Sequence, residues 1–226
     1  MPNDVGSEQR ITLPRPKPGQ PSKNERLAQI YQAAAVVIHE HGYDAASLND
    51  IAKAAGLTKA GLYHYVSSKE GLLFEIMNFG MDLVDSDVLE PARAVHDPCG
   101  RLRTLVKAYA NLVMEERHQA ITIIINEANG LTPARRSVIR TRRQVFYQFV
   151  GDTIQQIKDE GEIEVLDVGV TTLNFVGCLV WLAYWYSPGG RLTKKQVTNE
   201  IMGLLVDRLV GLNLQTESAR QRDAIF

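Results

Sequence analysis

Residues 47–73, SLNDIAKAAGLTKAGLYHYVSSKEGLL, predict two short helices joined by a tight turn. Ser47 is a good N-cap for the first helix, and Asp50 three residues later can complete a capping box with its backbone. Gly56 supplies the left-handed residue that commonly ends a helix. Apolar residues recur between them at helical spacing and predict one buried face: Leu48, Ile51, Ala52 and Ala55. We therefore interpret the stretch as a helix-turn-helix.

The second of these helices is predicted to turn most of its surface outward. Thr58 caps it, and few of its side chains beyond Leu62 and Tyr65 are apolar enough to be buried. A short helix with small residues at its start and hydrogen-bonding groups further along suits insertion into a DNA major groove. We therefore expect the following residues to contact DNA: Ser47, Thr58, Lys59, Ala60, Gly61, Tyr63, His64 and Lys69.

The chemistry of these side chains divides them between base reading and positioning. Lys59 is expected to reach guanine O6 or N7, Ala60 can touch a thymine methyl group, and Gly61 allows close approach. Phosphate contacts position a protein on the duplex without reading its sequence. Hydroxyl, imidazole and ammonium groups suit that role, which we assign to Ser47, Thr58, Tyr63, His64 and Lys69. The alternative for His64 is a ring packed inside the protein.

These residues resemble the N-terminal domain of TetR-type transcriptional regulators. The matching segments are HGYDAASL at 41–48 and AGLTKAGLYHYVSSKEGLL at 55–73, and the resemblance covers residues 24–75. It implies an all-α fold of about nine helices, with an N-terminal three-helix DNA-binding domain and a C-terminal helical bundle. It also implies the DNA contacts above, except that Gly61 stands where many family members have Ser or Thr. The alternative is a helical hairpin that caps a larger fold.

The remainder of the chain is also predicted to be helical. Apolar spacing and capping residues predict helices that begin near residues 24, 67, 100, 119, 133, 168 and 193. Ser67 with Glu70 and Thr193 with Gln196 are interpreted as capping boxes, and Pro91 is expected near the end of the helix that follows Ser67. Only 121–125, ITIII, resembles a strand, and its helical neighbours argue against one.

Four segments follow from this pattern. We expect a flexible Pro-rich arm at 1–22, a helix-turn-helix domain at 23–70, a ligand-binding and dimerisation domain at 71–214, and a polar tail at 215–226. Basic residues of the arm could touch DNA, namely Arg10, Arg15 and Lys17. The alternative is that the arm is a leader without such a role.

Composition is that of an ordinary globular protein, and it excludes several other classes. The chain has 226 residues, of which 45% are hydrophobic and 23% charged, and a formal net charge of −1. DNA affinity must therefore come from local placement of charge. Cys99, Cys178 and the five histidines show no metal-ligand spacing, and no nucleophile elbow or phosphate-binding glycine loop occurs. We expect reduced, buried thiols and neither an enzyme nor a cofactor or metal site; a helical adaptor is the remaining alternative.

The helix expected near 168–186 is apolar around its circumference. A helix that is apolar on every side is buried on every side. Its strongly apolar part, 175–186, is too short to span a bilayer, so we expect a soluble, cytoplasmic protein. One face is expected to meet the core and another a second subunit, with the last helix completing an intersubunit bundle; the alternative is an internal helix of a monomer. A single recognition helix has a small footprint, so we expect a homodimer on a palindromic operator.

The family resemblance implies a repressor that a small molecule releases from DNA. Candidate walls of its site are Tyr109, Val113, Ile124, Phe146, Phe149, Phe175, Trp181 and Trp185, although core packing explains most of them equally well. They favour a hydrophobic effector. The segment WYSPGGRLT at 185–193 resembles the C-terminal domain of a family branch associated with fatty-acid and steroid-ring catabolism.

Three arginines narrow the expected effector to an acyl-CoA thioester. Arg136, Arg140 and Arg143 fall at i, i+4 and i+7 and predict one basic stripe on the helix near 133–159. Guanidinium groups bind phosphate oxygens in a bidentate manner, which suits the pyrophosphate of CoA. The alternatives are a solvated face or salt bridges to Glu115 and Glu116.

Overall fold

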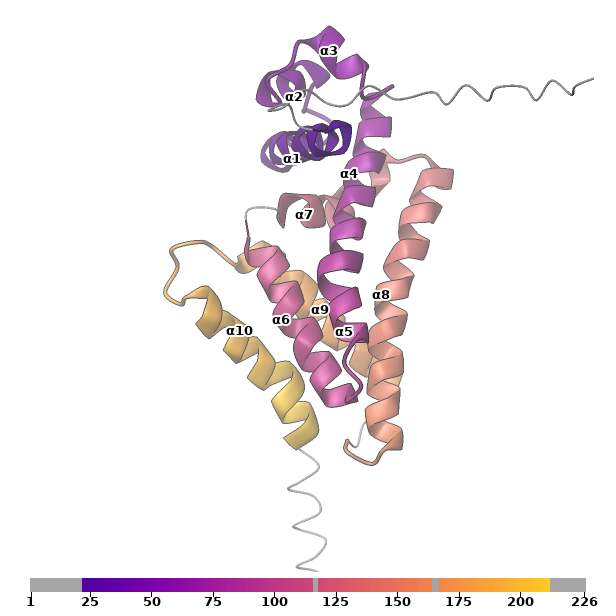
Figure 1. Ribbon diagram of the computed structural model, residues 1–226, viewed down its shortest axis with the longest axis vertical. Coiled ribbons are helices and arrows are strands. Elements are labelled where there is room, and N and C mark those ends of the chain that lie inside the picture. The colour runs from indigo at the N-terminus through magenta and orange to yellow at the C-terminus, as the bar shows by residue number, and fades with distance from the viewer. Residues whose placement is uncertain (1–21, 116–117, 164–166, 212–226) are drawn as a thin grey trace, which may run out of the picture.

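The computed structural model of the protein describes residues 22–115, 118–163 and 167–211, which form helices joined by short connections (Figure 1). The α-helices are α1 (Lys23–His41), α2 (Leu48–Ala54), α3 (Lys59–Tyr63), α4 (Lys69–Val84), α5 (Glu90–Arg93), α6 (Pro98–Met114), α7 (His118–Asn126), α8 (Pro133–Asp159), α9 (Val168–Trp185) and α10 (Lys194–Met202). A π-helical turn, Asp85–Leu89, joins α4 to α5 without a break. Counted with α4 and α5 as one, the described residues form nine helices, which confirms the predicted all-α fold.

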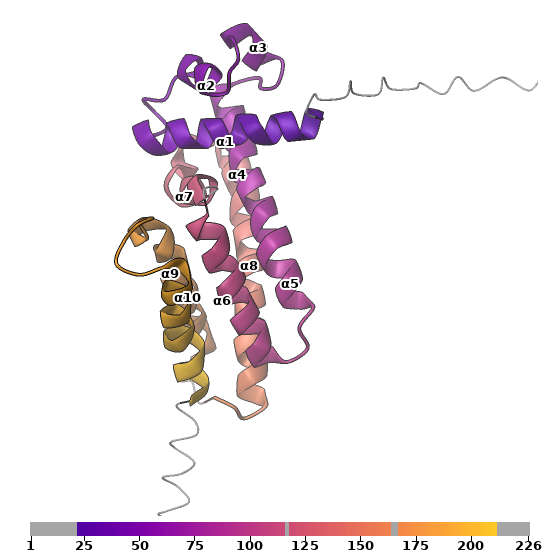
Figure 2. The ribbon, with the colours of Figure 1, turned by 60° about the vertical axis from the view of Figure 1, so that its left-hand side comes forward.

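The helices are arranged as a small head on a longer body. Figure 1 shows α1, α2 and α3 gathered at one end, with α4 running from them into the body. Figure 2 shows α1 lying crosswise to α4, with α7 beneath it; α1 packs against both. The segment 23–70 expected to bind DNA therefore corresponds to the head, and its proposed end at residue 70 falls in the first turn of α4. The expected tail, Arg10, Arg15, Lys17 and the arm apart from Ser22 lie outside the described residues.

The capping signals of the head are largely confirmed. Ser47 Oγ accepts a hydrogen bond from the Asp50 amide at 3.2 Å, and Thr58 Oγ1 accepts one from the Gly61 amide at 3.0 Å. Gly56 has a φ of +64°, as its left-handed role requires. In a departure from the expected capping box, the Asp50 carboxylate accepts from the Ser47 hydroxyl and not from its backbone.

The start of α4 differs from the predicted capping box by one residue. Ser68, and not Ser67, is the N-cap, and its Oγ accepts from the Gly71 amide at 2.9 Å. Glu70 turns instead to α8, where it accepts from the Thr132 amide at 3.0 Å and from Arg135 Nη1 at 2.7 Å. These hydrogen bonds lower the pKa of Glu70, and the one from the Thr132 backbone has the largest effect. The second predicted box, Thr193 with Gln196, is present at the start of α10.

The helix that begins with α4 continues through Pro91 to Arg93. Proline lacks an amide hydrogen and clashes with the preceding turn of a regular helix. The π-helical turn Asp85–Leu89 lies directly before it and changes the local winding. The helix therefore ends a few residues later than the predicted end near Pro91. The strand-like segment 121–125 is also helical, because it lies within α7.

Close packing joins α4 to α7. A Cβ placed on Gly80 would lie 2.7 Å from Ile124 Cδ1 and 3.2 Å from the Ala120 carbonyl oxygen. Both distances are shorter than ordinary van der Waals contact, so the glycine allows the two helices to approach. Helix α7 also packs against α1 of the head. Movement of α7 would therefore reach the DNA-binding end directly.

Arg142 ties α8 to the far half of α4. Its Nη1 donates to the backbone and side-chain oxygens of Asn78, each at 3.2 Å. Its Nη2 donates to Asp82 at 2.6 Å and to Asp85 at 2.8 Å. With the Glu70–Arg135 contact near the head, α8 is held to α4 at two points.

We expect Arg142→Met to lower the free energy of unfolding by about 1–2 kcal/mol. This loss in stability is the usual contribution of charge-assisted hydrogen bonds, lowered because Asp82 and Asp85 are partly exposed to solvent. Arg140→Met is the matched control on the same helix, since Arg140 is exposed and makes no hydrogen bond or ion pair with a described residue; it should change stability by less than about 0.5 kcal/mol. Denaturant titration measures both, and equal effects would contradict the clamp.

Candidate DNA interface and effector cavity

The outer surface of the head presents the residues expected to contact DNA. Helix α3 buries Leu62 alone and leaves Thr58, Lys59, Ala60 and Tyr63 exposed. Ser47 at the start of α2 is also exposed, and Gly61 is half-buried. The hydroxyl of Thr58 and the amine of Lys59, both exposed at the start of α3, are the kinds of group that a major-groove contact uses.

His64 and Lys69 differ in how far they are available to DNA. His64 follows the last residue of α3 and is exposed, which argues against a ring packed in the interior. Lys69 is half-buried: its Nζ donates to the Asp44 carbonyl at 3.0 Å and lies 4.6 Å from the centre of the Tyr43 ring. Lys69 therefore fixes the connection before α2, a role that sequence spacing did not reveal.

A cavity of about 50 Å³ lies in the body between α4, α6, α7 and α8. It brings together four of the residues predicted to bind the effector: Tyr109, Ile124, Arg143 and Phe146. The others that line it are Met81, Val84, Ile121, Ile125 and Tyr147, which sequence analysis missed. The i, i+4 pair Ile121 and Ile125 was a usable signal, because it places two aliphatic side chains on one face of α7.

The remaining predicted wall residues lie elsewhere. Val113 lines a separate cavity of about 260 Å³ near Tyr186 and Lys194. Phe175 is buried in the core, and Phe149 packs beside the Arg93 guanidinium, 5.7 Å from the ring centre. Trp181 and Trp185 lie on the outer face of α9. The structure thus divides the predicted set between a cavity, the core and the surface.

The three arginines of the predicted stripe have different surroundings. Arg136 Nη2 donates to the carbonyls of Asn129 and Leu131, at 3.2 and 2.9 Å, and so closes the turn after α7. Arg140 is exposed. Arg143 is half-buried, lines the cavity, and makes no hydrogen bond or ion pair with a described residue. Of the three, Arg143 has its charge directed at a space that a ligand could fill.

Tyr109 adds a second polar group to the cavity. Its side chain is only 3% exposed, and its ring packs 5.7 Å from that of Phe146. Burial raises the pKa of its hydroxyl, the neighbouring Tyr147 raises it further, and the Arg143 charge opposes the rise. The hydroxyl is therefore a neutral donor. No described residue accepts a hydrogen bond from it.

The outer face of α9 is apolar and exposed. Its stripe comprises Val170, Leu173, Trp181, Tyr184 and Trp185, and Trp181, 61% exposed, stacks on Tyr184 at 4.8 Å. By length and composition alone the whole helix could cross a membrane, with a mean hydropathy of 1.5 and 28% of it buried, although core helices of soluble proteins meet the same test. The twelve-residue length that was judged too short to span a bilayer, 175–186, covers only the most apolar part of this helix. Cys178 on this helix is exposed, contrary to expectation, whereas Cys99 is buried; both are free thiols.

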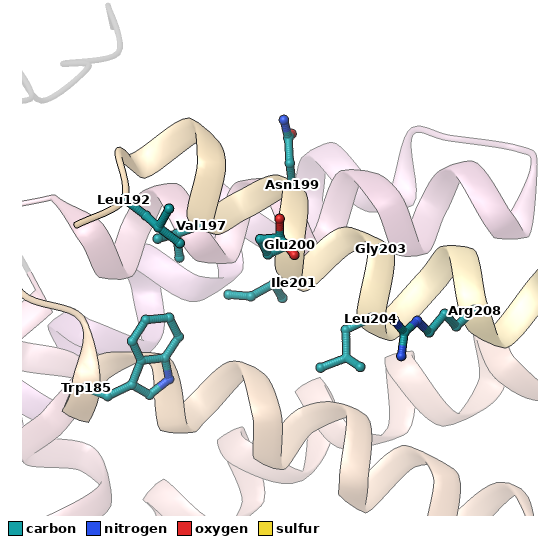
Figure 3. Close-up of a pocket in the computed structure, with 9 residues that line it drawn as sticks. All are labelled: Trp185, Leu192, Val197, Asn199, Glu200, Ile201, Gly203, Leu204 and Arg208. Atoms are coloured by element: carbon teal, nitrogen blue, oxygen red, sulfur yellow. The ribbon is translucent and has the colours of Figure 1, made fainter. Parts of the chain in front are cut away.

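A groove of about 470 Å³ separates α9 from α10. Figure 3 shows Trp185 of α9 facing Ile201 of α10 and Leu204 of the π-helical turn Gly203–Asp207 that follows α10, whereas Asn199 points away. Leu204 is exposed and Leu205 half-buried, so the former extends the apolar surface. Among the described residues, no three His, Cys, Asp or Glu side chains are grouped to hold a metal ion.

Comparison with protein families agrees with both halves of this architecture. Residues 30–76 match the family described as bacterial regulatory proteins, tetR family. Residues 96–209 match the tetracyclin repressor-like C-terminal domain. The first match covers the helix-turn-helix, and the second covers most of the body, including α6 to α10.

Individual relatives are transcriptional regulators. The chain is 28% identical to the transcriptional repressor KstR2 of Mycobacterium tuberculosis over 81% of this chain and 92% of that one. It is 27% identical to the activator FasR of Mycolicibacterium smegmatis over 71% and 74% of the two chains. The structure of AibR in complex with isovaleryl coenzyme A and operator DNA is similar with a TM-score of 0.75 and 36% identity, over 80% of this chain and 98% of that one. The chain therefore belongs to the TetR family of transcriptional regulators, which are not enzymes.

Proposed function

We propose that this regulator is a homodimeric repressor that binds a palindromic operator and is released by an acyl-CoA thioester. The observation that carries the proposal is the apolar cavity beneath the head, in which Arg143 has no partner among the described residues. Two relatives support it: KstR2 is a repressor, and the AibR structure contains both isovaleryl coenzyme A and operator DNA. We assign the head, 23–70, to DNA binding and the body, 71–214, to effector binding and dimerisation, in the bacterial cytoplasm where the DNA lies.

On the operator, we assign base reading to the start of α3 and positioning to its flanks. Lys59 reaches guanine and Ala60 a thymine methyl, while Gly61 allows close approach. Phosphate contacts come from the exposed polar residues Ser47, Thr58, Tyr63 and His64. Lys69 supports the head through Asp44 and Tyr43, and its charge still favours the phosphate backbone at longer range.

Dimerisation through α9 and α10 gives the exposed apolar stripe a function. Exposed apolar patches of this kind, rimmed by polar residues, mark interaction surfaces. The groove between α9 and α10 can accept side chains of the same two helices from a second copy. Two heads held at a fixed separation then meet two half-sites of a palindrome.

The effector acts through α7 in this proposal. A ligand shifts an equilibrium only if it binds the two conformations with different affinity. Ile124 lines the cavity and packs against Gly80 of α4, where a Cβ would leave no room. The neighbouring Thr122 Oγ1 lies 3.2 Å from His39 Nδ1 of α1. A ligand that displaces α7 therefore shifts its contacts with α1, which belongs to the head, and with α4, which connects the head to the body.

Substitution of Arg143 tests the effector role. We expect Arg143→Met to keep operator affinity but to need roughly 10- to 100-fold more thioester for release, since a hydrogen bond to a charged group is lost. Fluorescence anisotropy with labelled promoter DNA from beside the gene, titrated with CoA thioesters and their free acids, measures this. Arg140→Met, on the exposed side of the same helix, should respond like the unaltered protein. Release by free acids or unrelated hydrophobic compounds, but by no thioester, would overturn the acyl-CoA assignment.

A further inference from the structure

The turn between α7 and α8 contacts the head at Tyr43. A short 3₁₀ turn, Ala128–Gly130, follows α7. A Cβ placed on Gly130 would lie 2.7 Å from Tyr43 Cε1 and 2.8 Å from Leu73 Cδ2 of α4. Both distances are far shorter than van der Waals contact, so only a residue without a side chain fits between the two. The body therefore meets the connection between α1 and α2 at this glycine.

Hydrogen bonds from α8 and to α4 hold the turn in place. Arg136 Nη2 donates to the carbonyls of Asn129 and Leu131, the two residues that flank the glycine, at 3.2 and 2.9 Å. The next amide, that of Thr132, donates to Glu70 Oε1 at 3.0 Å. Hydrogen bonds to charged groups are the stronger kind. The turn therefore presents a fixed surface to the head.

Tyr43 belongs to a compact connection that leads directly into the helix-turn-helix. Lys69 Nζ lies 4.6 Å from the centre of the Tyr43 ring and donates to the Asp44 carbonyl at 3.0 Å. The Ala46 amide donates to the Gly42 carbonyl at 3.1 Å and closes the connection. Helix α2 begins directly after its N-cap, which is the next residue. A shift of the Tyr43 ring therefore reaches α2, and through α2 the recognition helix α3.

We infer that Tyr43 is a positioning residue for operator binding, through which the α7–α8 turn sets the angle at which the head meets DNA. Leu73 is fully buried, whereas Tyr43 is half-buried, so Tyr43 is the neighbour that can move when the turn moves. The turn continues α7, whose Ile121 and Ile124 line the cavity in the body. The inference rests on the proposed function, because the angle of a head decides whether two linked heads meet two half-sites at once.

Gly130→Ala tests the contact with the smallest change. The site in promoter DNA from beside the gene is footprinted, and its half-sites are then moved together or apart by one or two base pairs. The unaltered protein should bind one spacing best. Gly130→Ala should bind that spacing roughly tenfold more weakly and lose its preference for it, because the added methyl group displaces Tyr43. Asn129→Ala, which places alanine at the exposed neighbouring position of the same turn, is the matched control and should keep the preference.

Binding to a single half-site separates a changed angle from a damaged head. One head suffices there and its DNA contacts are unaltered, so Gly130→Ala should bind such DNA within about twofold of the unaltered protein. An equal loss on the single half-site and on every spacing would overturn the inference, as would an unchanged affinity and preference; the proposed repressor would stand in both cases. An unaltered protein without any spacing preference would instead remove the proposed dimer on a palindrome, and the inference with it.

Further variants identify the residues that carry the contact. Tyr43→Ala should broaden the spacing preference by itself, and Gly130→Ala should then add little, because substitutions of residues in contact are not additive. Additive effects would overturn the role of Tyr43. Arg136→Met frees the turn from α8 and should broaden the preference in the same way, whereas Arg140→Met, exposed on the same helix, should not. An Arg136→Met protein with an unchanged preference would overturn the role of the fixed turn.

Discussion

Trp181→Asp is expected to give a folded monomer that binds promoter DNA roughly 100-fold more weakly than the unaltered protein. Trp181 is 61% exposed in the single chain, so its replacement removes little core packing. At a subunit interface the same change removes a large aromatic contact and buries a charge without a partner. The loss on DNA is larger than the loss of one contact, because two linked heads bind with an effective concentration that a monomer lacks.

Sedimentation at micromolar concentration, with and without promoter DNA, measures the oligomeric state. Val138→Asp is the control, since it places the same charge on an apolar residue of α8 that is 47% exposed. Helix content by circular dichroism establishes that both variants fold. A Trp181→Asp protein that remains dimeric with full affinity would refute the α9–α10 interface, and a monomeric unaltered protein on DNA would refute dimerisation altogether.

The head could be predicted from sequence because its signals are local. Ser47, Gly56 and Thr58 act within one helical turn, through their own hydrogen bonds or backbone conformation. Where two candidates stood side by side, as with Ser67 and Ser68, the pattern could not choose between them. Glu70 was assigned to the wrong partner because the donors to its carboxylate, the Thr132 amide and Arg135 Nη1, come from the start of α8, far along the chain.

The residues that line the candidate cavity were predicted only in part, because the cavity depends on how helices pack. Helix α9 is apolar all round, so its sequence could not tell an inward tryptophan from an outward one, and Trp181 and Trp185 proved to be exposed. The three arginines Arg136, Arg140 and Arg143 lie on one helix, α8, but their spacing does not reveal that Arg136 is bound to backbone carbonyls. Arg143 differs from them only through its tertiary surroundings.

Loss of base discrimination in Lys59→Ala is the second large effect that we expect. A good contact to guanine contributes about 1–3 kcal/mol of discrimination, and a dimer on a palindrome makes it twice, so the variant should lose about 2–6 kcal/mol between cognate DNA and DNA with both guanines replaced. Anisotropy titrations of both proteins with both DNAs give the four affinities of a double-mutant cycle. Lys53→Ala, an exposed lysine on α2, is the control for loss of positive charge.

The double-mutant cycle separates base readout by Lys59 from its general electrostatic attraction to DNA, which a single measured affinity cannot do. If Lys59 only neutralised a phosphate, Lys59→Ala would weaken binding to both DNAs equally and lower the salt dependence of binding by about one ion per head. The control Lys53→Ala should show that same pattern if Lys53 lies near the DNA backbone. If Lys59 reads guanine, the variant no longer distinguishes the two DNAs. Replacing the guanine in one half-site should then cost about half as much as replacing both. That proportion joins the readout to the proposed dimer, because only two equivalent heads make the half-sites contribute equally.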